Sequence, residues 1–558
     1  MIKQREIEVI IQNTDQRHKF PLGTSLDEII AELKIKLKYP IIGAMVNNKL
    51  KELDYAIFKP KTIKFIDLTH PDGMRMYVRS LSFILIRAAK NLFPNRRLTI
   101  EHSVSNGYYC EFEGDNKELS IEDIIALQKE MRLIIDSNFP FVREEILTEE
   151  AIALFEKHGS QNKADLFKTR KLLYTSVYIL DGVPDYFYGY LAPSTAYINI
   201  FDLYKYYNGM LLRVPTISNP DQVAPIVIQD KMFEIFQEHK RWNEIIKVDT
   251  VGQLNQATEN GTISDLIMVS EALQEKKMAA IADLINDRNP MPRIILISGP
   301  TSSGKTTSAK RLEVQLKVLG IFPQTISLDN YFVNRIDTPK DKNGEYDFEN
   351  IKALDIALFN KQLLQLLKGE EVEVPRFNFG TGERFYAGDF LHLDSKSVLV
   401  IEGIHALNPL LTNKIPSNAK FKVYVSALTA LCMDEHNRIP TTDNRLIRRI
   451  VRDHQYRGYS AQETIKRWPS VRRGEEKYIF PFQEEADVMY NSALLFELGV
   501  LKQYAEPILR EVSPKTPEYA EAARLLKFFT YLSSIPEKEI PPTSILREFL
   551  FGSSFRYH

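Results

Sequence analysis

The fold of this chain is constrained most by one short string, Gly299-Pro300-Thr301-Ser302-Ser303-Gly304-Lys305-Thr306-Thr307. The string fits the pattern G-x-x-x-x-G-K-[ST], and it follows the apolar segment 294–297 after a single serine. Glycines allow a tight turn in which successive N–H groups point at phosphate oxygens, and the following helix adds the positive end of its dipole. The sequence therefore predicts a buried strand, a phosphate-binding loop and a helix that ends near Gly320.

Two residues of this loop are suited to hold a nucleoside triphosphate. Lys305 would neutralise the β- and γ-phosphates, and the Thr306 hydroxyl would ligate Mg²⁺. A second oxygen ligand is expected from Glu402, because it closes the run of apolar strand formers at 398–401. A strand that ends in Glu is weak evidence alone, since every strand must surface somewhere, and the upstream loop strengthens it.

Asp329 is the candidate for the base that an acceptor hydroxyl needs. It ends the strand-like segment 325–328, and parallel strands bring their carboxyl ends to the sheet edge where ligands bind. A kinase needs such a base, whereas hydrolysis needs only a positioned water. The alternative is that Asp329 and Asn330 simply begin a turn, as this pair often does.

Four arginines share one face of a predicted helix, because Arg445, Arg448, Arg449 and Arg452 fall at i, i+3, i+4 and i+7. Like charges at this spacing repel by roughly a few tenths of a kcal/mol per pair, so an anion is expected to face them. A triphosphate is a suitable counter-ion, and an Arg-rich lid would exclude water during transfer. The alternatives are a solvated basic face and an RNA-binding patch.

The chain is long enough for several folding units, because 558 residues correspond to roughly three to five domains. The capping-box pair Ser25 and Glu28 lies within a strand-rich start typical of a β-grasp unit. An amphipathic helix over 76–92 precedes aromatic, strand-like segments that form an α+β unit. After two helical stretches, strands alternate with helices from 293 onward, which favours a parallel sheet, and the last sixty residues are expected to be mainly helical.

The composition excludes several classes of protein. Apolar residues at 44% and charged residues at 26% are ordinary for globular chains, so a wholly disordered or disulfide-scaffold protein is excluded. Lys and Arg (72) nearly cancel Asp and Glu (73), so any nucleic-acid or nucleotide site must be local. Cys110 and Cys432 fit no metal clip and are expected to be buried thiols. No apolar run reaches the ~20 residues that span a bilayer, and no signal-peptide core is visible at the start, so a cytoplasmic location is expected.

Residues from about 290 to 500 resemble the uridine kinase/phosphoribulokinase family of P-loop kinases. The family's linked motifs occur here in order, as GPTSSGKTT, SLDNYF, YDFEN, VPRFNF, VLVIEGIHAL and RLIRRIVRD. The resemblance implies transfer of a phosphoryl group from ATP with Mg²⁺, with Asp329 as the catalytic aspartate, Glu402 as the metal-linked glutamate and the arginine helix as the lid. It also implies that Glu349 holds ribose hydroxyls and that Phe377 and Phe379 flank a nucleobase.

The chain departs from this family at one position. The histidine that reads the pyrimidine edge in uridine kinases would fall about three residues after Phe379, where this chain has Gly382. Arg384, or a residue from another domain, is a candidate to replace it. The preferred base and the choice between ATP and GTP therefore remain open, and the acceptor need not be uridine.

The front of the chain resembles two modules of tRNA synthetases. Residues 1 to about 68 resemble a TGS domain, and residues from about 70 to 212 resemble the second additional domain of threonyl- and alanyl-tRNA synthetases. Where that domain has zinc ligands, this chain has Arg79, Phe83, Phe187 and Leu191. Such side chains do not hold zinc, so no zinc and no aminoacyl-ester hydrolysis are expected here. A binding or regulatory role remains, and the nearby tyrosines are expected to be core more than base-stacking platforms, while the lone His102 is expected to be structural.

Together these observations predict a multidomain α/β and α+β protein. The expected units are a TGS-like β-grasp domain (1–68), an α+β domain (69–215), a helical connector (216–288), a P-loop nucleoside kinase with a parallel sheet (289–500) and a helical tail (501–558). The expected activity is ATP- and Mg²⁺-dependent phosphorylation of a nucleoside 5′-hydroxyl, with Lys305, Asp329, Arg448, Arg449 and Arg452 as catalytic residues. Arg445 and Arg384 join Glu349 and the two phenylalanines as expected substrate contacts. A nucleotide-responsive RNA-binding protein and a phosphosugar kinase are the alternatives; the oligomeric state is not predicted.

Overall fold

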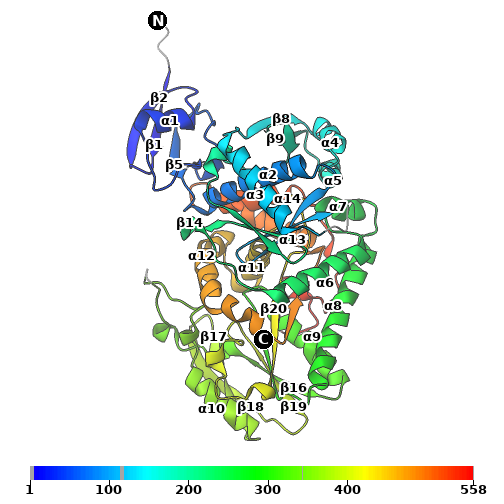
Figure 1. Ribbon diagram of the computed structural model, residues 1–558. Helices are drawn as coiled ribbons and strands as arrows, with labels where there is room; N and C mark the ends of the chain where they lie inside the picture. Colours follow the sequence, from blue (N-terminus) through cyan, green and yellow to red (C-terminus); the bar gives the residue numbers. More distant parts are fainter. Residues whose placement is uncertain (1–4, 114–117, 342–343, 557–558) are drawn as a thin grey trace.

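The computed structural model describes residues 5–113, 118–341 and 344–556. The chain is a mixed α/β and α+β protein, with its N-terminal sheets at one end and a parallel sheet at the other (Figure 1). No helix in the described ranges is long and apolar enough to cross a membrane.

The first unit is a five-stranded sheet in the order β2-β1-β5-β3-β4 with one helix. The predicted capping box at Ser25 and Glu28 is confirmed and begins the helix. Alternating apolar residues of the strands, such as Val9 and Ile11, are fully buried and form the core of the unit. Its elements are β1 (Glu6–Ile11), β2 (Gln16–Pro21), α1 (Leu26–Leu33), β3 (Gly43–Val46), β4 (Lys49–Lys51) and β5 (Lys61–Ile66).

The middle region combines a long buried helix with antiparallel sheets in the orders β11-β12-β7-β6, β10-β9-β8 and β13-β14. The helix predicted over 76–92 begins earlier, because Pro71 occupies its first turn and His70 caps it. The elements are α2 (Pro71–Leu92), β6 (Arg97–Val104), β7 (Gly107–Glu113), α3 (Ile121–Asp136), β8 (Val142–Leu147), α4 (Thr148–Lys157), α5 (Gln161–Thr169), β9 (Tyr174–Leu180), β10 (Val183–Asp185), β11 (Asp202–Tyr206), β12 (Gly209–Arg213), β13 (Pro215–Thr216) and β14 (Asn219–Val223).

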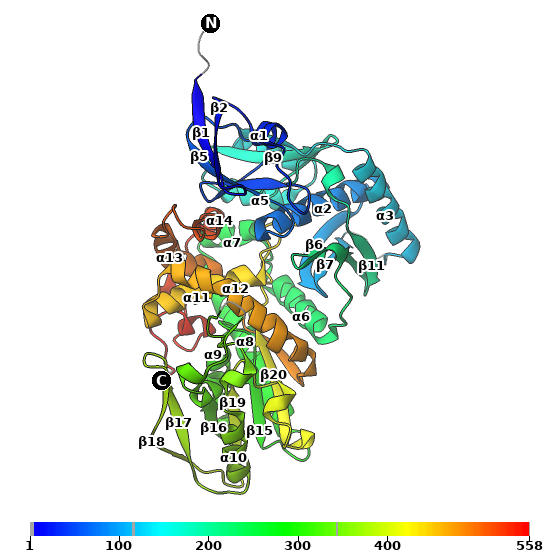
Figure 2. The same ribbon diagram turned by 90° about the vertical axis from the view of Figure 1, so that its left-hand side faces the viewer.

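Helices α6 (Asp230–Ile246), α7 (Val251–Glu259) and α8 (Ile263–Asn286) connect this region to the parallel sheet. The sequence predicts the first and third of them, but it misses α7, which is short and follows a capping box at Thr250. Helix α8 packs along α9 (Figure 2), where the Glu275 carboxylate accepts a hydrogen bond of 2.6 Å from the Arg311 guanidinium. The connector is therefore part of the support for the phosphate-binding loop.

The C-terminal half contains a five-stranded sheet in the order β16-β19-β15-β20-β21, in which every neighbouring pair is parallel. Every residue of the central strands β15 and β19 is buried, as expected for a sheet covered on both faces. The strands are β15 (Ile294–Ser298), β16 (Phe322–Ser327), β19 (Ser397–Glu402), β20 (Lys420–Ser426) and β21 (Val488–Asn491), and the hairpin β17 (Val372–Asn378) and β18 (Glu383–Leu391) lies apart from them.

The helices of this half are α9 (Lys305–Val318), α10 (Ile356–Leu367), α11 (Thr441–Arg457), α12 (Ala461–Tyr478), α13 (Glu497–Arg510) and α14 (Tyr519–Phe529). The prediction of a mainly helical end is wrong beyond Phe529, where the residues described up to 556 form two short 3-10 helices, Glu537–Glu539 and Ile545–Glu548, and no α-helix. This part is still ordered by packing, because Ile545, Leu546 and Phe549 are fully buried.

The middle region and the C-terminal half share one apolar core. It joins Phe155 and Phe167 of the middle region to Leu446 of α11 and Leu525 of α14. The two parts are thus held together by burial of apolar surface, and they are not beads on a flexible linker.

A fully buried group of charges lies in the same junction. The Lys163 amine has no exposed surface and lies 3.1 Å from Asp185, 3.2 Å from Asp434 and 3.2 Å from Glu435. His436 Nδ1 lies 2.8 Å from Asp185 Oδ2 and 2.8 Å from the Lys163 amine. Burial alone would raise the pKa of Asp185, but His436 and Lys163 hold that pKa well below its ordinary value. This group therefore joins Lys163 and Asp185 of the middle region to Asp434, Glu435 and His436 of the C-terminal half.

Candidate active site

The phosphate-binding loop has the strand–loop–helix geometry that the sequence predicts. It leaves the central strand β15 and enters α9 with Ser302 and Gly304 in the left-handed region, at φ values of 57° and 82°. A Cβ atom on Gly299 would lie 1.9 Å from the Val425 carbonyl oxygen, so only glycine fits at the start of the loop. The hydroxyl oxygens of Ser302 and Ser303 are buried and have no hydrogen-bond partner among the described residues. The loop is thus shaped to cradle an anion.

Lys305 and Thr306 begin α9 at the mouth of this loop. The Lys305 side chain folds back on the loop, and its amine donates a hydrogen bond of 3.1 Å to the Pro300 carbonyl. The Thr306 side chain is half-buried, and its hydroxyl makes no hydrogen bond to any described residue. Both groups are therefore available to a phosphate and its metal ion.

Glu402 and Asp329 meet at the carboxyl edge of the sheet beside this loop. Glu402 is the last residue of β19 and pairs in register with Ile297 on one side and Ser327 on the other. Asp329 lies two residues after Ser327, in a short 3-10 helix, and is half-buried. Burial raises the pKa of Glu402 to about 7; Lys305 opposes this, and Asp329 adds to it, so both charges lie near this carboxyl.

The oxygen donors at this edge fit Mg²⁺. The Thr306 hydroxyl and the Glu402 carboxylate are hard oxygen ligands, and Mg²⁺ ordinarily takes one or two protein carboxylates and completes its shell with phosphates and water. In the described ranges, no group of three or more His, Cys, Asp or Glu side chains is arranged to hold a metal ion. A magnesium ion here would therefore depend on the nucleotide for part of its ligand shell.

Glu349 and His405 line the same site. Burial raises the pKa of Glu349 to about 7, with Glu475 adding to the shift and Arg449 and Lys305 opposing it. Its Oε2 atom is buried and has no partner in the described chain, which suits an acceptor that awaits hydroxyl donors. His405, which the sequence analysis missed, is 1% exposed, and burial lowers its pKa to about 4, so it forms a neutral wall.

Three phenylalanine rings gather at the turn of the hairpin β17–β18. The Phe377 ring centroid lies 5.3 Å from that of Phe379 and 5.6 Å from that of Phe332. The sequence analysis named the first two and missed Phe332. Phe379 remains 53% exposed and so offers an open aromatic surface beside the site.

Gly382, which stands where the histidine was expected, lies against Arg335 and not against Arg384. Gly382 has a φ of 77°, and a Cβ atom there would lie 2.7 Å from the Arg335 Nε atom. The Arg335 guanidinium also donates a hydrogen bond of 2.7 Å to the Phe379 carbonyl. Arg384 instead donates to the Asp355 carboxylate at 2.9 Å. Arg335 is therefore better placed than Arg384 to contact a ligand that lies on Phe379.

Three arginines of α11 share a single carboxylate. Arg449, Arg452 and Arg457 lie 3.1, 2.8 and 3.5 Å from Asp453, which is itself buried. Arg457 was not among the predicted residues; repulsion from Arg452, and then burial, lower its pKa to about 10. The Arg449 guanidinium also approaches the Thr301 hydroxyl of the loop, at 3.4 Å. The group keeps an excess positive charge next to the phosphate-binding loop.

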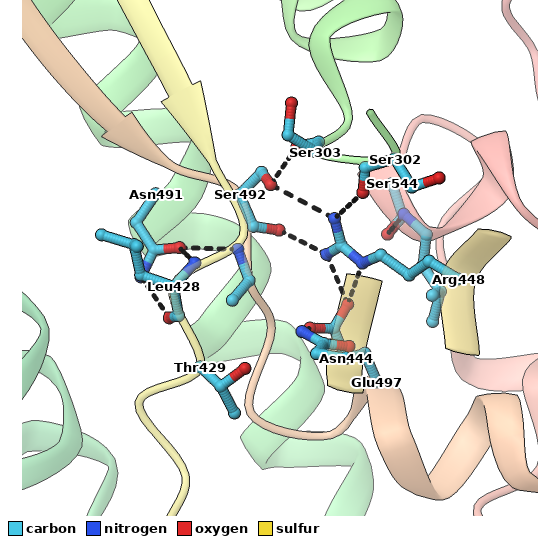
Figure 3. Close-up of polar contacts among 12 residues, drawn as sticks. Ser302, Ser303, Leu428, Thr429, Asn444, Arg448, Asn491, Ser492, Glu497 and Ser544 are labelled. Atoms are coloured by element: carbon cyan, nitrogen blue, oxygen red, sulfur yellow. Dashed lines mark hydrogen bonds and ion pairs between the residues drawn. The ribbon is translucent and has the colours of Figure 1, made fainter. Parts of the chain in front are cut away.

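Arg448 points the other way and braces the loop from behind (Figure 3). It has no exposed surface, and its guanidinium donates to the Ser302 carbonyl at 3.4 Å, to the Ser492 carbonyl at 2.9 Å and to the Glu497 carboxylate at 2.8 Å. Arg445 is similar: it forms an ion pair with the buried Glu475 and donates to the Thr301 carbonyl at 3.0 Å. The anions that face these two arginines are thus side chains of the protein.

The final segment of the chain also reaches this site, which the sequence does not predict. The Glu548 carboxylate accepts hydrogen bonds from the Thr307 backbone amide at 3.1 Å and from its hydroxyl at 2.8 Å. The Ile545 side chain packs so closely on Gly304 that a Cβ atom there would lie 2.7 Å from it. Glu548 also adds to the raised pKa of Glu402. No local pattern near residue 548 signals this contact, because it joins segments that are far apart in sequence.

The residues that stand where the resembled editing domain has zinc ligands lie close together. The Phe83 and Phe187 ring centroids are 5.4 Å apart, and Phe187 and Leu191 are buried in the core of the middle region. Arg79 lies beside them, with its guanidinium 5.1 Å from the Tyr188 ring centroid. His102 stacks on Phe236 with 3.7 Å between ring centroids and is buried, as expected of a structural histidine. Cys110 is buried as predicted, but Cys432 is only partly so.

Comparison with known proteins supports both resemblances. The front of the chain is similar to threonine--tRNA ligases. The match to the ligase of Syntrophotalea carbinolica is 28% identical over 234 residues, 40% of this chain and 37% of the ligase. The match to that of Thermotoga neapolitana is 32% identical over 153 residues, 27% of this chain and 23% of the ligase. The chain thus spans well under half the length of the curated relatives it matches.

Part of the chain is also similar to a solved structure described as a possible uridine kinase from Bacillus stearothermophilus, at 19% identity and a TM-score of 0.27, with 39% of this chain and 98% of that chain covered. Residues 294–494, which contain the loop, both candidate carboxylates and the arginine helix, match the Phosphoribulokinase / Uridine kinase family, so the predicted family resemblance of this segment is confirmed.

Proposed function

We propose that this protein transfers the γ-phosphoryl group of ATP to the 5′-hydroxyl of a nucleoside, with Mg²⁺. The observation that carries the proposal is the convergence of four features at one sheet edge: the phosphate-binding loop, Asp329, Glu402 and three arginines that share one carboxylate. Phosphoryl transfer requires mainly positioning and charge stabilisation, and this arrangement offers both.

Each group has a role that follows from its place. The loop amides and Lys305 bind the phosphates, while the Thr306 hydroxyl and the Glu402 carboxylate hold Mg²⁺, which supplies charge neutralisation when bound. Asp329 accepts the proton of the acceptor hydroxyl as the new bond forms. A side chain at the carboxyl end of a strand next to the loop strand is well placed for this step.

The arginines divide into two groups in this proposal. Arg449 and Arg452, joined by Arg457, have too few carboxylates to neutralise them, which suits stabilisation of the transferring phosphoryl group. The guanidinium groups of Arg448 and Arg445 already donate hydrogen bonds to the loop and its surroundings and to buried carboxylates. This geometry favours a positioning role for them over the direct contacts that the sequence predicts.

A nucleoside is favoured as acceptor over a phosphosugar. The aromatic group of Phe332, Phe377 and Phe379 offers flat surfaces to a base, and the unpartnered Glu349 oxygen suits ribose hydroxyls. A phosphosugar acceptor would need a cation for its own phosphate and would make no use of the exposed Phe379 ring. Arg335 is the candidate reader of the base edge.

The test is transfer of radiolabelled phosphate from ATP to a panel of nucleosides and phosphosugars with the full chain. The proposal expects phosphorylation of at least one nucleoside, its loss in Lys305→Ala and Asp329→Asn, and normal turnover in the exposed control Asp337→Asn. Turnover of a phosphosugar alone would replace the nucleoside by the second candidate acceptor. Unchanged turnover in both site variants would overturn the role assignment.

The similarity of the front of the chain to threonine--tRNA ligases supports a second candidate role, RNA binding. On this proposal the front modules bind RNA and the P-loop half responds to nucleotide. Tight, salt-sensitive binding of tRNA by the full chain, with no acceptor phosphorylated, would favour this role over the kinase.

A further inference from the structure

Four basic side chains from four separate elements converge where α14 meets the middle region. Lys527 of α14 and Arg143 of β8 point at the same ring, with their charged groups 5.9 Å and 5.5 Å from the Tyr190 ring centroid. Arg79 of α2 donates to the Tyr190 carbonyl at 3.4 Å. Arg170, which ends α5, lies 4.2 Å from the ring centroid of Tyr531, just beyond α14. We call Arg79, Arg143, Arg170 and Lys527 the basic cluster.

Among the described residues, no carboxylate forms an ion pair with the basic cluster, although the Glu52 carboxylate lies near Arg143 and Lys527. Within the described residues, no Asp or Glu oxygen lies within 4.0 Å of any of its four charged groups. The neighbouring cations are different: one turn earlier on α14, Arg524 forms ion pairs with Asp443 at 2.6 Å and with Glu521 at 2.5 Å. Arg75 of α2 lies 3.2 Å from the same Glu521. Carboxylates therefore accompany the arginines that hold this junction together, and they are missing from the basic cluster alongside.

The positive charges of the basic cluster also repel one another. Packing around the Lys527 amine, and then repulsion from Arg79, Arg170 and Arg143, lower the pKa of Lys527 to about 8, although the side chain as a whole keeps exposed surface; Glu52 opposes the shift only in part. The Arg170 Nε atom is buried and has no hydrogen-bond partner among the described residues. Four like charges that are held together with less counter-charge than they carry destabilise the protein unless an anion joins them.

The local backbone is fitted to this arrangement. A Cβ atom on Gly189 would lie 2.2 Å from the Arg79 guanidinium, so the absence of a side chain at this position makes room for that guanidinium. Lys527 and Arg143 are exposed, whereas Arg79 and Arg170 are half-buried, so the basic cluster can be reached from solvent. Tyr188 and Tyr190 are likewise half-buried and lie at the same place.

We propose that the basic cluster binds the phosphate groups of a nucleotide, at a site separate from the phosphate-binding loop. Guanidinium forks match phosphate oxygens in bidentate geometry, and four cations exceed what a single carboxylate ligand would neutralise. Tyrosine rings beside such cations suit a stacked base. A free nucleotide and the end of an RNA strand share this chemistry, and the experiment below distinguishes them.

The test uses the full chain with Lys305→Ala, so that the phosphate-binding loop does not contribute, and isothermal titration calorimetry with three probes. The probes are inorganic tripolyphosphate, UTP and a short single-stranded oligouridylate. We expect K305A to bind tripolyphosphate and either UTP or the oligonucleotide, and the added pair Arg79→Met and Lys527→Met to weaken this binding by about tenfold or more. Tighter binding of UTP identifies a free nucleotide, and tighter binding of the oligonucleotide identifies RNA.

Two further variants make the result decisive. Lys538→Met removes an exposed lysine whose side chain is 78% exposed, and it should leave binding unchanged. Arg143→Met, at an exposed position, should weaken binding even if the paired variant fails to fold. A merely structural cluster would lose thermal stability on substitution, whereas removal of unneutralised charge should leave the ligand-free protein as stable as before or more stable. Failure of K305A to bind any probe, or equal binding by K305A with and without the cluster substitutions, would overturn the proposal.

Discussion

The carboxylate of Glu548 accepts hydrogen bonds from both the backbone amide and the hydroxyl of Thr307, at 3.1 and 2.8 Å. Thr307 lies in the first turn of α9, where the helix dipole and free amides attract anions. A side chain from the end of the protein therefore takes an anion position at the nucleotide site. An incoming triphosphate meets this negative charge before it can use the same donors.

Neutralising this charge should strengthen ATP binding. Glu548→Gln keeps a carbonyl oxygen that accepts from Thr307 but removes the repulsion of a phosphate, so the Kd for ATP should fall by about twofold to tenfold, as expected for a charge at a helix N-terminus. Equilibrium titration with a fluorescent ATP analogue measures it, with Glu539→Gln as the control. Weaker binding by E548Q would show that Glu548 acts together with the nucleotide.

Asp329→Asn should slow turnover with little effect on ATP affinity. The amide retains the shape of the side chain but cannot accept the proton of the acceptor hydroxyl, so kcat should fall by about 10²–10⁴. Steady-state kinetics with ATP and the best nucleoside measures kcat and KM separately. A fall in kcat of less than about tenfold would remove Asp329 from the role of base.

Replacement by methionine should mainly lower activity at Arg452 and mainly lower stability at Arg448. Arg452→Met should lower kcat by about 10²-fold or more with little change in Tm, because Arg449 and Arg457 would still pair with Asp453. Arg448→Met should instead cost about 3–5 kcal/mol of the free energy of unfolding, because Glu497 would remain buried without its partner. Urea unfolding measures the latter, with Arg510→Met on the surface as control.

The combination of Arg448→Met with Glu497→Leu tests the cause of that loss. Replacement of a whole buried ion pair by apolar groups often costs little, so the double variant should be more stable than Arg448→Met alone. A double variant less stable than either single one would mean that packing and not the unpaired charge dominates.

The buried group around Lys163 predicts a pH dependence of stability. The pKa of Asp185 is held below its ordinary value in the folded protein, so its stabilisation is present above the unfolded pKa of roughly 4 and is lost as pH falls. Lys163→Met should cost about 3–5 kcal/mol near pH 7, because three carboxylates lose their shared cation. The difference in the free energy of unfolding between wild type and Lys163→Met should shrink as pH falls towards 4. The buried carboxylates of the variant have lost their cation and take up protons there.

The control for Lys163 is Lys168→Met on the same helix. Lys168 pairs with Glu156 and Asp165, but its side chain is 41% exposed, so its loss should change stability by about 1 kcal/mol or less at any pH. Urea unfolding of wild type and both variants across this pH range measures the difference. A Lys163→Met penalty that stays constant with pH would contradict the electrostatic explanation.

The sequence correctly predicts those features that are determined by residues close together in the chain. The phosphate-binding loop, the helix after it and the strand that ends at Glu402 follow from short apolar runs, glycines and one lysine. The capping box at Ser25 is equally local. The parallel order of the sheet follows because alternating strands and helices have few other solutions.

What it misses depends on contacts between distant segments. Nothing near Glu548 indicates that it meets Thr307, and nothing in the spacing of the arginines indicates that Arg448 faces the buried Glu497 while Arg449 approaches the loop at Thr301. Amphipathic spacing assigns residues to a helix face but not to the neighbour of that face. The irregular end of the chain was misread as helix for the same reason: its burial comes from tertiary packing and not from a helical pattern.

The packing of the final segment against the nucleotide site has a practical consequence for anyone who prepares this protein. The Tyr456 hydroxyl donates to the Leu550 carbonyl at 2.6 Å, and Phe549 is fully buried beneath the Arg448 guanidinium, so residues 549–550 are held firmly against the rest of the protein. A bulky group attached beside these residues would crowd the phosphate-binding loop and distort kinetic measurements. Strand β1 lies far from this region in both views (Figures 1 and 2), so its neighbourhood is the safer point of attachment.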